Sequence, residues 1–481
     1  MSSAQHESGR PSESGYRRRY AIVGTGARAE MFVRALAVDH AERCELVALA
    51  DTNPVRARVH NEALTAYGAP PAAVYDAADF RRMLDAEQVD TVVVTTVDRF
   101  HDEYIVAALD AGRDVITEKP MTIDADRCRS ILDAVARTGR RVTVTFNYRY
   151  NPLHEKVREL LANGEIGEIG SVHFEWLLDV RHGADYFRRW HRDKANSGGL
   201  LVHKATHHFD LINWWLGAVP EQVYAQGRLF FYGDEAGRRH GYARDYERAY
   251  GSPEAIGDPF ALDLAAADGM RRLYLEAEGH DGYHRDRNVF APGVTIEDDL
   301  AVLVRYSTGA TMTYHLTAYS PWEGYRVMFN GSRGRLEVEV VENDHVIPAP
   351  PRGDSSPGVP GDAPAGASAA YPADASPKSA SLHGAEAAAE RGWSRLRVCP
   401  FWREPYDVEV PDLGRAGHGG ADARLAAALF GGDTAPDPLG RGATERDGAL
   451  SLLTGLAGNE SLVTGAPVRV ADILDLGAYT R

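Results

Sequence analysis

Cysteine is scarce in this chain of 481 residues, and the scarcity excludes two kinds of architecture. Only Cys44, Cys128 and Cys399 are present, and their spacing does not match that of a metal-binding cluster. An odd number of widely separated cysteines predicts reduced thiols rather than a disulfide scaffold. We expect all three to be small buried residues.

The chain also lacks a long apolar run and an excess of basic residues. No segment approaches the ~20 apolar residues of a membrane helix. Fifty-three Lys and Arg against 69 Asp and Glu give a formal charge of −16, which disfavours nucleic acid and anionic membranes as partners. Arg17–Arg19 resemble a twin-arginine signal, but a strand rather than a removable apolar segment is predicted after them. The expected location is the cytoplasm.

Two stretches are poor in large apolar residues. Residues 1–16 are rich in Ser, Glu and Gly, and residues 348–392 are rich in Pro, Ala, Gly and Ser. Such segments bury too little surface to offset the entropy of ordering. We predict a disordered tail at 1–16 and a disordered insertion at 348–392, between the strands RLEVEV and RLRVCPFW. The polar, tyrosine-rich residues 232–292 are expected to form a partly helical excursion near the active-site mouth.

A glycine turn lies near the start of the chain, between a predicted strand and a predicted helix. Gly24 and Gly26 permit a tight turn that lets the backbone approach a pyrophosphate. Asp51 ends the next strand, 22 residues beyond Ala29, where it would accept hydrogen bonds from the adenosine ribose. Its neighbours Thr52 and Asn53 supply no cation, so the pattern favours NAD over NADP. Predicted cofactor contacts in this region are Gly24, Thr25, Gly26, Ala27, Arg28 and Asp51.

The order of the predicted elements indicates two domains. In residues 17–147, strands at 90–97, 114–120 and 141–147 alternate with helices at 102–111 and 124–138, which is typical of a doubly wound parallel sheet. In residues 148–481, strands follow one another without helices, as in a hairpin over 300–320 that turns at Thr308–Gly309. We predict a Rossmann dinucleotide-binding domain, followed by an α+β domain for substrate binding and oligomerisation. This second domain should contain a large, mainly antiparallel open sheet.

The tripeptide Glu118-Lys119-Pro120 ends one of these strands, and GGLLVHKATHHFDLINWWLG occupies 198–217. Together with the glycine turn, these motifs resemble the Gfo/Idh/MocA family of sugar and cyclitol oxidoreductases, from about residue 18 to the C-terminus except for the insertion. The resemblance implies that Lys119 lies beside the nicotinamide and the substrate hydroxyl. An ammonium at the carboxyl end of a parallel strand lies where such sheets bind ligands, and it stabilises alkoxide charge. Further cofactor contacts implied are Thr96, His101, Glu118 and Lys119.

A second motif runs from His203 to Asp210, where the family pattern is D-x-G-x-H-x-x-D. His207 matches the catalytic histidine and Asp210 the later aspartate, whereas His203 and Ala205 replace the usual aspartate and glycine. An imidazole with a pKa near the working pH is suited to accept the proton of a secondary alcohol. His207 is therefore the predicted proton acceptor. The other predicted catalytic residues are Lys119, Lys204 and His203.

Three alternatives remain open for these residues. On a helix, His203, His207 and Asp210 would share one face, so they could instead bind a divalent metal ion. The resemblance implies a metal-free site, and we predict no metal ion. Lys204 either faces the nicotinamide, where neighbouring cations would depress a lysine pKa, or is solvated at the helix rim. Arg28 either contacts phosphate or covers the start of the helix.

Candidate substrate contacts are aromatic, charged and amide side chains, because these groups recognise sugar C–H faces and hydroxyls. They occur in the loop at 185–199 and in an N-Y-R run at 147–149 that is similar to the family's. The predicted set is Asn147, Arg149, Tyr186, Trp190, Arg192, His208 and Asp210, with Lys194, Glu323, Tyr325 and Arg326 as further candidates. The alternatives are a solvated basic loop and, for His208, a packed histidine.

These features predict an NAD-dependent oxidoreductase that transfers hydride between nicotinamide and a ring hydroxyl of a sugar, glycoside or cyclitol. An alternative is an enzyme with tightly bound NAD that oxidises its sugar transiently for elimination, epimerisation or glycoside cleavage. A non-catalytic NAD-binding regulator is a third reading, which the presence of both Lys119 and His207 disfavours. The resemblance implies a homo-oligomer, either a dimer or a tetramer.

Overall fold

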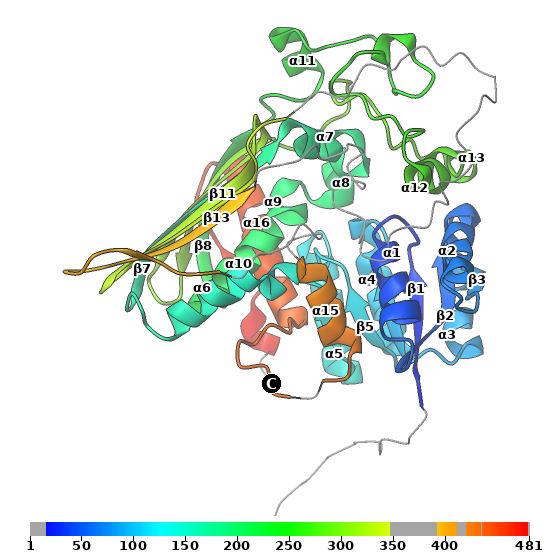
Figure 1. The fold of residues 1–481 in the computed structure, drawn as a ribbon, viewed down its shortest axis with the longest axis horizontal. Coiled ribbons are helices and arrows are strands. Elements are labelled where there is room, and N and C mark those ends of the chain that lie inside the picture. Colours follow the sequence, from blue (N-terminus) through cyan, green and yellow to red (C-terminus); the bar gives the residue numbers. More distant parts are fainter. Residues whose placement is uncertain (1–15, 347–391, 411–419, 434, 480–481) are drawn as a thin grey trace, which may run out of the picture.

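The computed structural model describes residues 16–346, 392–410, 420–433 and 435–479 (Figure 1). The predicted tail and insertion lie outside these residues, apart from Tyr16 and Gly392 at their margins. The described residues form two sheets, one of six strands and one of nine. Among them, no helix is both long enough and apolar enough to cross a membrane.

The first domain is built on a six-stranded parallel sheet with the order β3-β2-β1-β4-β5-β6. Its central strand β4 is buried throughout and β1 is buried from Tyr20 onward, as a parallel sheet covered on both faces requires. The predicted Rossmann fold is confirmed. The strand order reverses between β1 and β4, which creates a ligand-binding crevice at the carboxyl ends of the strands. The strands are β1 (Arg18–Val23), β2 (Cys44–Asp51), β3 (Ala73–Asp76), β4 (Thr91–Val94), β5 (Asp114–Thr117) and β6 (Val142–Val144). The helices are α1 (Ala29–Arg34), continued by a π-helical turn (Ala35–Asp39), α2 (Pro54–Ala66), α3 (Phe80–Ala86), α4 (His101–Asp110) and α5 (Ala125–Thr138).

The second domain contains a nine-stranded sheet with the order β14-β13-β12-β11-β7-β10-β9-β8-β15. It is mainly antiparallel, as predicted, with one parallel pair, β7 and β10, among its described strands. The predicted hairpin is present, because β9 and β10 pair in antiparallel register around Gly309, whose φ is +86°. The strands are β7 (Ile169–Asp179), β8 (Pro220–Arg228), β9 (Asp299–Tyr306), β10 (Thr311–Ser320), β11 (Glu323–Gly331), β12 (Gly334–Asn343), β13 (Trp393–Pro400), β14 (Tyr406–Asp407) and β15 (Val468–Arg469).

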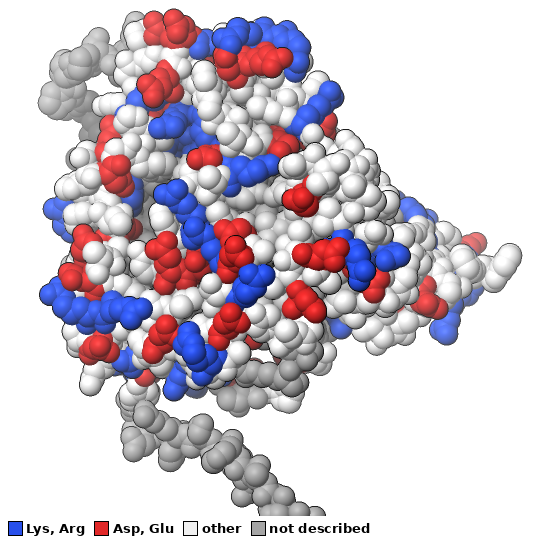
Figure 2. All heavy atoms as spheres, turned by 180° about the vertical axis from the view of Figure 1, so that it is seen from behind, with Lys and Arg blue, Asp and Glu red and all other residues white. Residues whose placement is uncertain are grey.

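One face of this large sheet is packed and the other is open, because buried and exposed residues alternate along strands such as β9. Helices lie between this sheet and the first domain (Figure 1). They are α6 (Pro152–Ala162), α9 (Leu200–His203), α10 (Ala205–Leu216) and α16 (Glu445–Thr464). On the molecular face drawn in Figure 2, basic and acidic side chains are interspersed rather than segregated.

The end of the chain returns to the first domain. Helix α16 packs on β8 and α10 and also on α5 and β6. Helix α15 (Ala421–Phe430) places Phe430 against Tyr20 and Phe32, with ring centroids 5.4 and 6.5 Å away. These two helices therefore join the domains at the side of the Rossmann sheet.

Residues 232–292 form short helices, as predicted, joined by irregular segments. The helices are α11 (Asp234–His240), α12 (Asp268–Met270) and α13 (Glu278–Asp281), with a π-helical turn at Arg271–Leu275 and a 3₁₀ turn at Pro253–Ala255.

All three cysteines are free thiols. Cys44 and Cys128 are buried as expected, but the expectation is wrong for Cys399. On β13 it is half-buried, because it shares the open face of the sheet with Arg335 of β12.

Candidate active site

The glycine turn has the geometry that a dinucleotide site needs. Gly24 has a φ of +86°, and a Cβ at this position would lie 2.6 Å from the backbone nitrogen of Thr96. Only glycine therefore lets β1 turn this closely over the end of β4. The Thr25 backbone N–H and hydroxyl both donate to Asp51 Oδ2, at 2.6 and 2.9 Å. The turn and the carboxylate predicted to bind ribose are thus joined directly, and both fit a nicotinamide dinucleotide.

Two further turn residues, Ala27 and Arg28, contact distant parts of the chain. The Ala27 N–H donates to Tyr274 Oη at 3.0 Å. Arg28 binds Glu118 through Nε at 2.6 Å and Asp422 of α15 at 3.2 Å. Arg28 therefore ties the turn to the E-K-P motif rather than lying free to receive phosphate.

The expectation that no cation lies beside Asp51 is wrong. Arg56, on the first turns of α2, brings Nη1 to 3.8 Å from Asp51 Oδ1. The helix that follows β2 turns this side chain back over the strand end, which the flanking residues Thr52 and Asn53 do not reveal. The guanidinium is also committed to Asp281, with Nη2 at 2.7 Å from Oδ2.

Thr96 and His101 lie together at the end of β4. The ring of His101 spans two loops, with Nδ1 2.9 Å from the Pro120 carbonyl oxygen and Nε2 3.2 Å from that of Thr96. Burial lowers the pKa of His101, so the ring is neutral. Its position holds the E-K-P loop against the β4 loop.

Lys119 follows β5 at the carboxyl edge of the parallel sheet. Its ammonium donates to the His203 carbonyl oxygen at 3.2 Å. Burial lowers the pKa of Lys119 to about 8, against the attraction of Asp98 and Glu118. Lys119 therefore exchanges its proton near neutral pH and lies at the junction of the two domains.

A carboxylate from the first domain meets His203. Asp98, in the loop after β4, places Oδ2 2.5 Å from His203 Nδ1. Burial raises the pKa of Asp98 and lowers that of His203 well below its usual range. Both shifts favour the neutral forms, so the pair shares a proton within a dry environment. Sequence reasoning missed Asp98, although its place after a central parallel strand is a signal for ligand binding.

The continuous helix assumed for 203–210 is wrong. Helix α9 ends at His203, and α10 begins at Ala205. At this break the Leu201 carbonyl is pressed against Gly455 of α16, where a Cβ would come within 2.4 Å of the oxygen. Lys204 lies at the break and is buried, with Nζ 4.9 Å from the ring centroid of Trp176. Burial lowers the pKa of Lys204, so the solvated-rim alternative is also wrong.

His207 lies one turn into the buried side of α10. Its ring stacks on Tyr148 at 4.4 Å with an interplanar angle of 17°. The ring of Phe146 is tilted against it at 67°, with the ring centroids 6.1 Å apart. Phe146 and Tyr148 lie on either side of the predicted domain boundary, so the boundary itself orients the predicted proton acceptor.

Asp210 does not share a ligand set with the two histidines. Its carboxylate binds Arg149 at 2.6 and 2.8 Å, and Asp447 binds the same guanidinium at 3.0 Å. Burial raises the pKa of Asp210 to about 6, against the attraction of Arg149. Asn147 donates to Asp422 at 2.8 Å. Within the described residues, no group of three or more His, Cys, Asp or Glu side chains has an arrangement suited to a metal ion.

The end of α7 (Val180–Arg188) and the 3₁₀ turn that follows it (Trp190–Arg192) place aromatic residues beside His203. Tyr186 and Trp190 both present their rings edge-on to His203, at 5.6 and 5.7 Å. His191, which sequence reasoning missed, lies 4.1 Å from the same ring. These three residues form one wall of the candidate site.

Other residues predicted to contact substrate make hydrogen bonds, ring contacts or ion pairs within the protein. Arg192 donates to the carbonyl oxygens of residues 288, 291 and 292 and so anchors the excursion. His208 is within hydrogen-bonding distance of Tyr314 Oη, 2.6 Å away, and stacks on Trp176 at 4.1 Å. Lys194 binds Glu297 at 2.5 Å. His208 therefore matches the packed alternative.

The three candidates on β11 point in different directions. Glu323 lies 2.6 Å from His182 Nδ1, near the wall formed by α7. Tyr325 is buried, and its hydroxyl lies 2.6 Å from His154 Nε2. The expectation for Arg326 is wrong, because this residue lies on the open face with Glu339 at 2.8 Å.

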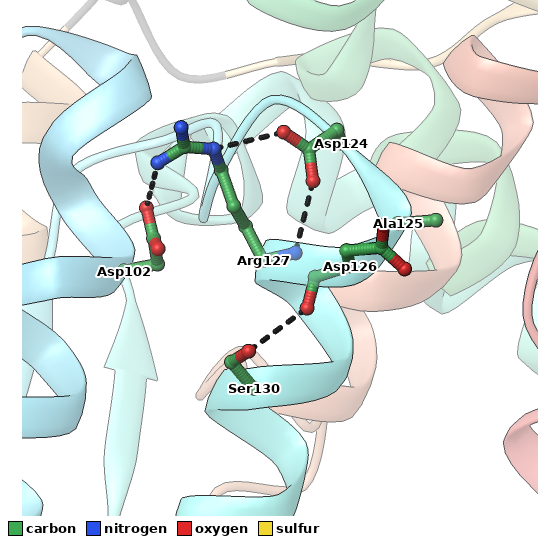
Figure 3. A pocket seen from close by; sticks show the side chains of 6 residues that line it. All are labelled: Asp102, Asp124, Ala125, Asp126, Arg127 and Ser130. Carbon is green, nitrogen blue, oxygen red and sulfur yellow. Dashed lines mark hydrogen bonds and ion pairs between the residues drawn. The ribbon is translucent and has the colours of Figure 1, made fainter.

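A separate hollow of about 600 Å³ lies beside the start of α5 (Figure 3). Its centre is Arg127, which bridges Asp102 at 3.0 Å and Asp124 at 2.8 Å. These side chains satisfy one another, and none belongs to the histidine cluster. The hollow is therefore a surface feature of the α4–α5 packing.

Comparison with known proteins identifies this arrangement. The family model described as "Oxidoreductase family, NAD-binding Rossmann fold" matches residues 18–146, and the companion model for the C-terminal alpha/beta domain matches residues 158–349. A Bacillus subtilis (strain 168) protein called YteT, named as an oxidoreductase, is 37% identical over 68% of this chain and 78% of its own length. An inositol 2-dehydrogenase of Rhizobium meliloti (strain 1021) is 28% identical over 56% of this chain and 80% of its own length.

Solved structures share the fold at lower identity. The WlbA dehydrogenase from Bordetella pertussis, in complex with NADH and UDP-GlcNAcA, has a TM-score of 0.57 at 18% identity, covering 94% of this chain and 99% of its own. An oxidoreductase domain protein from Kribbella flavida has a TM-score of 0.59 at 17% identity, covering 94% and 99%. The family-model matches and the YteT relationship are decisive: this chain belongs to the Gfo/Idh/MocA family of oxidoreductases and carries its NAD-binding Rossmann domain.

Proposed function

We propose that this protein is an NAD-dependent dehydrogenase acting on a ring hydroxyl of a sugar, glycoside or cyclitol. The observation that carries the proposal is the meeting of Lys119 with His203 and Asp98 at the carboxyl edge of the Rossmann sheet. Such an edge is the ligand-binding crevice of an open α/β sheet. The inositol 2-dehydrogenase relative supports a polyhydroxylated ring as the substrate class.

The glycine turn and Asp51 would hold the dinucleotide. When bound, the nicotinamide supplies the hydride acceptor or donor. Asp51 favours NAD, because a carboxylate accepts ribose hydroxyls and repels a 2′-phosphate. Arg56 weakens this repulsion only partly, since Asp281 binds the same guanidinium.

Lys119 would stabilise the substrate oxygen as its proton leaves. An ammonium in a buried site interacts strongly with developing alkoxide charge because little water screens it. Its lowered pKa of about 8 leaves most of the lysine charged at neutral pH. Its hydrogen bond to the His203 carbonyl fixes the ammonium near the second domain.

His207 would accept the hydroxyl proton. Its stacking on Tyr148 fixes the ring plane, so that one nitrogen is presented in a constant direction. A histidine base is effective near pH 7 because its ordinary pKa lies close to this value. Tyr186 and Trp190 supply apolar ring faces for the C–H side of a sugar.

One observation favours a second candidate function, in which NAD stays bound and the sugar is oxidised only transiently. The His203–Asp98 pair offers a second acid/base group beside His207. Elimination, or epimerisation at the carbon next to the new ketone, needs a proton to be taken from that carbon after oxidation, and simple dehydrogenation does not. The His203–Asp98 pair would serve that step.

The test begins with the purified protein. Bound nucleotide is released and identified, and a panel of sugars, glycosides and cyclitols is then screened with NAD at 340 nm. Net NADH formation with a member of the panel supports the dehydrogenase. Product formation without net NADH supports the second candidate. Absence of both, with a folded protein that binds NADH, contradicts both enzymatic functions.

A further inference from the structure

A segment of the second domain covers the nucleotide-binding turn of the first. Residues 262–285, called the strap below, contain α12 and α13 and lie beside α2 (Figure 1). Their apolar side chains form a small separate core that also contacts Ala27 and Val59 of the Rossmann domain. The strap core consists of Leu262, Leu264, Met270, Leu273 and Tyr274.

The central contact of the strap is made at the glycine turn. Tyr274 Oη accepts the hydrogen bond of the Ala27 N–H at 3.0 Å. In a dinucleotide site, the N–H groups of this turn bind the pyrophosphate. The hydroxyl thus accepts the hydrogen bond of an N–H that a bound pyrophosphate would use. Arg285 supports it, with the guanidinium carbon 4.5 Å from the ring centroid.

Further strap contacts surround the carboxylate predicted to bind ribose. Asn53 donates from its side chain to the Ala277 carbonyl oxygen at 2.9 Å, and Arg56 Nε donates to that of Leu273 at 3.2 Å. The same two residues contact Asp51, through the Asn53 backbone N–H at 2.8 Å and Arg56 Nη1 at 3.8 Å. The strap therefore contacts the residues predicted to surround both the pyrophosphate and the ribose.

Two buried donors beside the strap lack partners. Tyr283 Oη and Arg189 Nε make no hydrogen bond within the described residues. Tyr283 lies on the strap, where the Arg56 guanidinium carbon is 5.9 Å from its ring centroid. A buried hydroxyl and a guanidinium nitrogen left unpaired suit a ligand that brings its own oxygen acceptors.

We propose that the strap is the outer wall of the dinucleotide site, contributed by the second domain. Tyr274 accepts the hydrogen bond of the Ala27 N–H and would yield this N–H to the pyrophosphate when a nucleotide binds. The strap then closes over the nucleotide, so NAD binds and dissociates only when the strap opens. The inference rests on the proposed function only for the identity of the ligand, since it requires no chemistry on a substrate.

The test is rapid-mixing fluorescence of NADH binding to the full-length protein. If opening of the strap limits binding, the observed rate in wild type reaches a plateau as the NADH concentration rises. Tyr274→Phe keeps the ring and removes one hydrogen bond that holds the strap shut, so the plateau should rise by about 2- to 10-fold. Asp281→Asn weakens the ion pair with Arg56 and should raise the plateau as well. Tyr242→Phe, outside the strap, is the matched control and should equal wild type.

Other results would overturn the proposal. A rate that rises linearly with NADH concentration and is the same in all four proteins means that the strap does not control binding. A lower plateau in Tyr274→Phe means that the hydroxyl assists binding rather than closing the site. The binding assay uses NADH alone, so it can be interpreted even if the protein oxidises no sugar. Failure to oxidise any sugar would contradict only the proposed dehydrogenase. Failure of every variant to bind NADH contradicts both.

Discussion

His203 Nδ1 lies 2.5 Å from Asp98 Oδ2, which joins a residue of the second domain to the loop after β4 in the first. The family pattern has an aspartate where this chain has His203. In this protein a carboxylate is present nonetheless, but it comes from Asp98.

This relationship predicts that Asp98 and His203 act as a unit. Asp98→Asn and His203→Asn should each lower turnover by roughly 10- to 100-fold, at or below the lower end of the ~10²- to 10⁴-fold that a general acid or base usually contributes, because His207 remains in place. The double variant should be little worse than either single variant, because both changes remove the same interaction. Steady-state rates of the four proteins measure this coupling. NAD affinity should stay unchanged, and fully additive losses would show that the two residues act separately.

Cofactor choice should follow Asp51. NAD should bind at least ~10 times more tightly than NADP, a difference of about 1.4 kcal/mol. Isothermal titration calorimetry with both nucleotides measures the difference. Because Asp281 holds Arg56 away from a 2′-phosphate, Asp281→Asn should narrow the preference. Tighter binding of NADP by wild type would contradict the assigned role of Asp51.

Lys119→Ala should lower turnover by about 10² to 10³, the usual cost of removing one group that stabilises an oxyanion. NAD affinity should hardly change. The ammonium form is lost as the pH rises through the lysine's pKa of about 8, so wild-type activity should decline on the alkaline side near that pH. Lys119→Arg keeps its charge at higher pH and should remove this decline. A near wild-type rate for Lys119→Ala would show that the site is elsewhere.

His207→Ala should lose proton transfer and retain NAD. Its residual rate should rise with pH, because hydroxide substitutes for the missing base. A chelator should leave wild-type activity unchanged, and elemental analysis should find no stoichiometric metal, since Asp210 is bound by Arg149. A metal that restores a chelator-inactivated enzyme would reverse this assignment.

The parts of the site that were predictable from the sequence are those whose residues lie close together along the chain. The glycine turn, Asp51 and Lys119 each lie at or just after the end of a strand whose apolar run is plain in the sequence. The hairpin of β9 and β10 was predictable for the same reason, because its alternation and its Gly309 turn are local.

The parts that sequence missed depend on packing between distant segments. Asp98 and His203 are 105 residues apart, and Ala27 and Tyr274 are 247 apart. The helix break at Lys204 lies next to the close approach of Gly455 to Leu201, which no pattern around residue 204 encodes. Arg56 escaped notice because only the turn into α2 brings it back to Asp51.

Helix α15 has a consequence for any attempt to divide the protein. Phe430 fills the space beside Tyr20 and Phe32, so part of the Rossmann interior is completed by a residue almost 400 positions further along the chain. A fragment ending at residue 147 would leave that aromatic surface open to water and prone to self-association. The nucleotide-binding domain thus does not form its complete core without α15. A ribosome must finish most of the chain before the first domain acquires its complete core.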